Sequence, residues 1–107
     1  MKFPYFDKPL IAEKLPSGSW RVHEAFRYYQ TADLYVDVPE GFVTDFASVP
    51  RGLWNIVPPD GPYSQAAVLH DYLYQGHIFP RSACDKIFLD AMGALGVSDW
   101  KRYSMYW

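Results

Sequence analysis

The sequence is poor in the residues that would cross-link a small secreted protein or anchor a chain in a membrane. Cys84 is the only cysteine in 107 residues, which excludes an intrachain disulfide and a cysteine-based zinc site. The first ten residues, MKFPYFDKPL, lack the continuous apolar run of a secretory signal. No apolar stretch approaches the roughly 20 residues that a membrane span needs. We therefore expect a soluble protein made in a reducing cytoplasm, with no membrane partner.

An excess of basic charge is also absent. Ten basic side chains stand against twelve acidic ones, for a net charge of −2. Proteins that bind duplex nucleic acid usually carry a basic stripe, so duplex nucleic acid is not expected as a partner. A small anionic ligand needs only one or two cations and stays compatible with this composition.

Aromatic residues, by contrast, are abundant. Half of the chain is apolar and 19% is aromatic, with 9 Tyr, 7 Phe and 4 Trp. This composition excludes ordinary disorder, and the length predicts one compact domain over residues 1–107. We expect most rings to lie in the core, although a surplus of rings also suits a platform for sugars or bases, or an interface in a homo-oligomer.

The first half of the chain, residues 1–56, has the two-residue period of β-strands. In the run 20–29, Trp20, Val22, Glu24 and Phe26 fall on one face. The run 34–38 repeats this alternation, with Leu34, Val36 and Val38 on one side. Turns are expected at 16–19, 30–33 and 39–41, which predicts an antiparallel sheet of three or four strands.

The second half, residues 63–107, changes to a helical period after the Pro/Gly-rich segment 57–62. Helices are expected over 63–74 and 81–96, and a third, capped by Ser98 or Asp99, over 100–107. The apolar stripe of the second helix comprises Cys84, Ile87, Phe88, Ala91, Met92 and Leu95, and Lys86 and Asp90 are expected together on its solvated side. The predicted class is α+β: a small N-terminal antiparallel β-sheet followed by two or three α-helices packed on it.

Four polar residues stand where packing would favour apolar ones: Asp45, His70, Asp71 and Asp85. We expect them to form one catalytic site. One imidazole and three carboxylates suit Mg²⁺ or Mn²⁺ better than Zn²⁺, and such a cation would activate a bound water. Without a metal, His70 would act as a general base oriented by a carboxylate.

Three neighbours are candidates for substrate binding. Arg51 could clamp an anionic group, Ser48 could orient it, and Tyr74 shares a helix face with His70. Each polar residue also has an ordinary structural interpretation. His70 could be a core histidine, Asp45 could cap a turn, and Asp71 could bond a tyrosine hydroxyl or pair with Arg51. Asp85 could pair with Arg81 one turn earlier.

The motifs GFVTDFASVPR, PPDG-Y, AAVLHDYLY, R-ACDKIFLDAM-ALGV and the terminal MYW occur in this order between residues 38 and 107. The set resembles the family catalogued as domain of unknown function 1353, whose members are encoded largely by bacteriophages and prophages. The resemblance implies a phage origin and the same compact domain. The positions that match its motif are Asp45, Ser48, Pro50, Arg51, His70, Asp71, Tyr74 and Asp85.

We therefore expect a small phage-encoded, hydrolase-like protein in the cytoplasm of the infected host. Its substrate would be a phosphodiester, including a host signalling nucleotide, or a component of the cell wall. The alternatives are a non-catalytic virion or tail accessory protein, a module that binds a phage or host protein, and a protein that sequesters a small ligand. In these alternatives the Asp/His cluster is structural.

Overall fold

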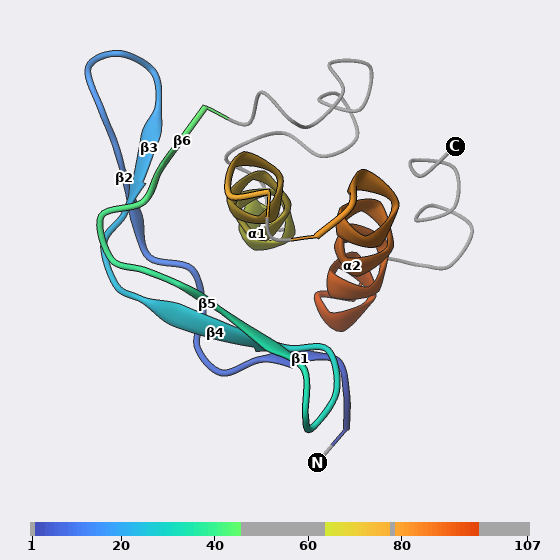
Figure 1. Cartoon of the computed structure of the whole chain (residues 1–107). Helices are drawn as coiled ribbons and strands as arrows, with labels where there is room; N and C mark the ends of the chain where they lie inside the picture. The colour runs from blue at the N-terminus through green and yellow to red at the C-terminus, as the bar shows by residue number, and fades with distance from the viewer. Residues whose placement is uncertain (1, 46–63, 78, 97–107) are drawn as a thin grey trace.

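The computed structural model describes residues 2–45, 64–77 and 79–96. Strands come first and helices follow, as predicted (Figure 1). The strands are β1 (Tyr5–Phe6), β2 (Ala12–Lys14), β3 (Trp20–Val22), β4 (Phe26–Tyr29), β5 (Tyr35–Val38) and β6 (Val43–Thr44). The helices are α1 (Ser64–Gln75) and α2 (Arg81–Ala94). The α+β class is therefore confirmed.

The described strands form two small antiparallel sheets. One has the order β1-β4-β5 and the other the order β2-β3-β6. In the first sheet Phe26 pairs with Val38 and Tyr28 with Val36, and all four of these side chains are buried. The period of two in the sequence thus marks the inward face correctly.

The run 20–29 is not one strand, and the prediction of continuous alternation was wrong at its centre. β3 ends at Val22 and β4 begins at Phe26, and Glu24 between them is exposed. Val22 bonds through its backbone to both Phe42 and Gly41 in the second sheet. The chain then bends at residues 23–25 and enters the first sheet, so the apolar face continues while the partner strands change.

The turns expected at 16–19, 30–33 and 39–41 all separate strands. Gly41 has φ +89°, a conformation that side chains with a Cβ rarely adopt. Leu34, which was predicted on the inward face with Val36, is instead exposed because it precedes β5.

The two helices agree closely with the sequence pattern. α1 and α2 begin and end within two residues of the predicted bounds, and Gly96 follows α2 with φ +93°. The helix expected over 100–107 lies outside the described residues. Five residues of the predicted α2 stripe are buried, and Leu95 is partly buried against the core. No helix in the described part of the chain is both long and apolar enough to cross a bilayer.

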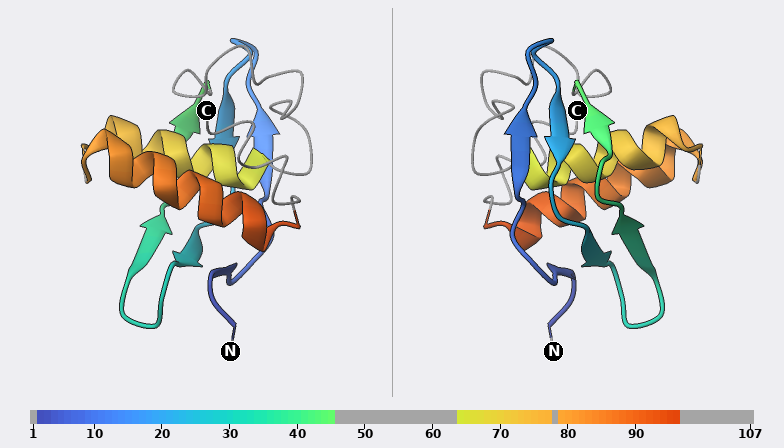
Figure 2. Two further views of the ribbon diagram at one scale, coloured as in Figure 1. Left: turned by 90° about the vertical axis from the view of Figure 1, so that its right-hand side faces the viewer. Right: turned by 90° about the vertical axis from the view of Figure 1, so that its left-hand side faces the viewer.

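Both helices pack on one side of the strands (Figures 1 and 2). The core lies between these layers and joins residues of β3, β4 and β5 to the apolar faces of both helices. Leu69, Leu73, Met92 and Tyr28 are its largest fully buried apolar or aromatic side chains. This packing sets the positions from which the polar residues of α1 project.

A polar chain links the first sheet to α2. The Tyr28 hydroxyl donates to Gln30 Oε1, and Gln30 Nε2 donates to Asp90 at 2.6 Å. Lys86 Nζ completes it at 2.9 Å from the other oxygen of Asp90. Lys86 and Asp90 therefore do lie together, but Asp90 was wrongly placed in solvent: its side chain is 19% exposed and bonds to the sheet.

The burial of the Tyr28 phenol leads us to expect a loss of stability at alkaline pH. Burial, with a contribution from the charge of Asp90, raises the pKa of this phenol well above its ordinary value of about 10. Above that pH the unfolded chain releases the proton while the folded chain keeps it, so the free energy of unfolding should fall as the pH rises. Burial also raises the pKa of the Cys84 thiol, which likewise lowers the free energy of unfolding as the pH rises.

We expect urea denaturation midpoints to fall steadily between pH ~9 and ~12, the range in which free thiols and phenols ionise. Tyr28→Phe should flatten the upper part of that fall, although it also removes the hydrogen bond to Gln30 at neutral pH. A Tyr28→Phe profile parallel to that of the wild type above pH ~10 would show that this phenol does not cause the loss.

Candidate functional site

The candidate site lies where the C-terminal half of α1 meets α2 on one side and β6 on another. α1 packs along α2 and also contacts β6, and Figure 1 shows the two helices side by side with β6 beyond α1. The adjacent residues His70 and Asp71 are both buried in α1. Because successive residues point about 100° apart around a helix, the two side chains reach different neighbours.

His70 reaches α2. Its Nε2 lies 2.9 Å from Oδ1 of Asp85. A carboxylate can only accept a hydrogen bond, so Nε2 carries the proton in this pair. The imidazole is 4% exposed and the Asp85 side chain is 39% exposed. The pair therefore joins a buried ring to a carboxylate that solvent can reach.

Aromatic rings surround the imidazole. The Phe88 ring lies 5.0 Å from the His70 ring, and the Tyr74 ring lies 6.2 Å away and nearly parallel to it. These rings limit the rotation of the imidazole about its side-chain bonds, so its orientation toward Asp85 is set by packing as well as by hydrogen bonding. Asp85 was expected to pair with Arg81 in the structural interpretation, and it pairs with His70 instead.

Asp71 reaches β6 and the end of its own helix. The Thr44 hydroxyl donates to Asp71 Oδ2, and Gln75 Nε2 donates to the same oxygen at 2.7 Å. Asp71 and Thr44 are each 1% exposed. A buried carboxylate is costly unless donors compensate it, and these two donors come from a strand and from the next helical turn.

The remaining predicted residues are placed as follows. Asp45 directly follows Thr44 and is exposed, and Tyr74 is an exposed residue of α1. Ser48 and Arg51 lie outside the described residues. The four expected catalytic residues thus include a contacting pair, His70 with Asp85, and a separately bonded Asp71. Within residues 2–45, 64–77 and 79–96, no group of three or more His, Cys, Asp or Glu side chains is arranged to hold a metal ion.

Sequence reasoning missed two partners, Thr44 and Gln75. Gln75 stands four residues after Asp71, a spacing at which helical side chains meet, so this bond had a readable signal. Thr44 is distant in sequence, and nothing local indicates that its hydroxyl reaches α1.

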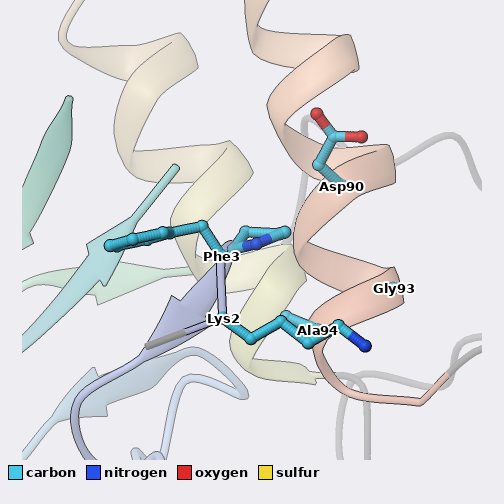
Figure 3. A pocket seen from close by; sticks show the side chains of 6 residues that line it. Lys2, Phe3, Asp90, Gly93 and Ala94 are labelled. Atoms are coloured by element: carbon cyan, nitrogen blue, oxygen red, sulfur yellow. The ribbon is translucent and has the colours of Figure 1, made fainter. Parts of the chain in front are cut away.

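A separate pocket of about 380 Å³ lies between the N-terminal segment and α2. Its lining comprises Lys2, Phe3, Pro4, Asp90, Gly93 and Ala94. Figure 3 shows Lys2 extending toward the end of α2 that carries Gly93 and Ala94, with Asp90 further along the helix. None of the predicted site residues lines this pocket, so it is distinct from the His70–Asp85 pair.

Comparison with known proteins places this chain in a family. An uncharacterised protein, y4jT, of Sinorhizobium fredii is 38% identical over 94 residues, which cover 86% of this chain and 28% of that protein. The chain thus spans little more than a quarter of the length of this relative. No solved structure matches. The family model described as "Protein of unknown function (DUF1353)" matches residues 20–107, and the chain therefore belongs to this family.

Proposed function

We propose that the protein is a hydrolase-like enzyme in which Asp85, held in position by His70, carries out proton transfer. The observation that supports this proposal is the 2.9 Å contact between a buried imidazole and a half-exposed carboxylate. General acid–base catalysis needs a titratable group within hydrogen-bonding reach of the substrate or of a water. Asp85 is the member of the pair with that access.

This exposure favours a division of roles opposite to the one expected from the sequence. Asp85 would take the proton from an attacking water, and the Nε2–H of His70 would hold the carboxylate in place. His70 is therefore a positioning residue in this scheme. Asp71, bonded to Thr44 and Gln75, would keep α1 in the orientation that presents His70 to Asp85.

The proposed substrate is a phosphodiester, including a host signalling nucleotide, or a cell-wall bond. Arg51 and Ser48 are the proposed groups that bind and orient an anionic part of it, Tyr74 is a further proposed substrate contact, and Mg²⁺ or Mn²⁺ is the proposed cofactor. The motif resemblance supports a phage or prophage origin and action in the cytoplasm of an infected host.

The test compares the wild type with Asp85→Asn on bis-p-nitrophenyl phosphate, a cyclic dinucleotide and purified peptidoglycan, each with and without added Mg²⁺ or Mn²⁺. Loss of a general base should lower kcat about 10²-fold or more. Asn keeps the shape of the side chain, so thermal unfolding should change little. Asp33→Asn, an exposed change in the turn before β5, is the matched control. Equal turnover by wild type and Asp85→Asn would exclude this role.

A second candidate function is non-catalytic: a virion or tail accessory protein, a host-interaction module or a small-ligand-binding protein. The near-complete burial of Asp71 between two donors favours a structural role for this part of the cluster. Absence of turnover on every substrate, with copurification of the protein with virions, would support the accessory role over the enzyme.

A further inference from the structure

The outer face of the β1-β4-β5 sheet carries a row of aromatic rings. Tyr5 pairs with Tyr29, and Tyr29 pairs with Tyr35, so the three tyrosines lie on one line across the strands. The rings of Tyr5 and Tyr29 stack at 4.9 Å, and Tyr29 and Tyr35 are 5.8 Å apart. Phe3 extends the row, with its ring 5.4 Å from Tyr5.

These rings lie on the solvent side of the sheet, with Phe3 and Tyr35 exposed and Tyr5 and Tyr29 partly buried, and none of the four belongs to the core. Their neighbours along the strands, Phe6 and Tyr28, point inward and pack in the core, and both helices lie on that inner side (Figure 2). Tyr35 is 48% exposed and Phe3 37% exposed. The Phe3 ring also points away from α2 (Figure 3). A contiguous exposed aromatic patch usually marks a binding surface.

A charge pair borders the row. Arg27 Nε and Nη2 donate to the two carboxylate oxygens of Asp37 at 2.7 and 3.1 Å, and Nη1 donates to the Tyr29 hydroxyl at 3.2 Å. The guanidinium also lies 4.0 Å from the centre of the Tyr35 ring. Asp37 neutralises Arg27, so the patch combines apolar rings with fixed hydrogen-bonding groups and has no net charge.

The stacked rings and the paired charges of this surface indicate which class of ligand it could bind. A nucleic acid needs cations for its phosphates, and the single arginine here is already paired. A second copy of the chain would need some 20–30 residues on each side for a standard interface, far more than this row provides. A proline-rich peptide needs a groove between rings, but Tyr5 and Tyr29 are stacked and leave no space between them.

We propose that this row binds an uncharged glycan. One face of a pyranose ring presents C–H groups that pack against an aromatic ring, and its rim presents hydroxyl groups. The Phe3 ring and the side of the Tyr35 ring that Arg27 does not cover would take the C–H faces, while Asp37, Arg27 and the tyrosine hydroxyls would bond the sugar hydroxyls. This surface is independent of the proposed reaction at Asp85, because binding requires no turnover.

The test titrates the protein with an uncharged oligosaccharide of four β-linked N-acetylglucosamine units, followed by calorimetry, and sediments it with purified peptidoglycan. Saturable binding is expected, and Tyr35→Ala should weaken it about tenfold. Tyr35→Leu should weaken it similarly, because the aliphatic side chain keeps apolar volume but loses the ring. Ile11→Ala removes an equally exposed apolar side chain outside this face and should bind as the wild type does.

Circular dichroism without ligand verifies that each variant folds, and Tyr5→Leu replaces Tyr35→Ala if the latter does not. The proposal is overturned if neither glycan binds the wild type, or if Ile11→Ala loses as much affinity as Tyr35→Ala. It is also overturned if the protein instead binds poly-L-proline or an oligonucleotide through Tyr35, or forms a dimer that Tyr35→Ala abolishes.

Discussion

Asp71→Ala is expected to lower the free energy of unfolding by about 3 kcal/mol. The change removes the acceptor of two hydrogen bonds and leaves the Thr44 hydroxyl and the Gln75 amide without it. Thr44 is as deeply buried as Asp71, so water cannot readily replace the lost carboxylate. Urea denaturation monitored by circular dichroism measures this loss.

Two companion variants separate the hydrogen bonds from the loss of volume. Thr44→Val removes one donor while keeping the shape of the side chain, and should cost about 1–2 kcal/mol. The double variant Thr44→Val/Asp71→Ala should cost less than the sum of the two single changes, because the two residues share one bond. Strict additivity would mean that the bond between β6 and α1 contributes nothing to stability.

Leu73→Ala is expected to cost about 3 kcal/mol. Leu73 is fully buried in α1 and belongs to the core between the strands and the two helices. Truncation removes apolar contacts and leaves a cavity that packed neighbours on both helices cannot readily fill. The loss of free energy of unfolding is measured as a shift in the midpoint of urea denaturation, with the slope of the urea dependence unchanged.

Leu34→Ala is the matched control, because it makes the same chemical change at a site that is 39% exposed. Its effect should stay within about 0.5 kcal/mol of zero. Similar losses for Leu73→Ala and Leu34→Ala would contradict the placement of the core between the strands and α1.

Much of the fold could be predicted because local patterns determine it. The inward positions of β4 and β5 follow from a period of two, and the two described helices follow from the helical period and the breaks around them. The bend at residues 23–25 could not be predicted. Glu24 is the one polar residue on the predicted apolar face there, and a single polar residue does not indicate a bend. The backbone hydrogen bonds of Val22 with Phe42 and Gly41 separate β3 from β4.

The candidate site could likewise be predicted only in part from the sequence. His70, Asp71 and Asp85 are conspicuous in the sequence because they are polar residues within largely apolar helical segments. Their partners were not predictable, since the packing angle of α1 on α2 decides that His70 meets Asp85. Adjacent helical residues point in different directions, so His70 and Asp71 bond to different elements, α2 and β6.

That divergence has a mechanical consequence for α1. His70 is bonded to α2 and Asp71 to β6, at angles about 100° apart around the helix axis. Rolling the helix in either direction stretches at least one of these bonds, so the two contacts together fix the rotation of α1 about its own axis.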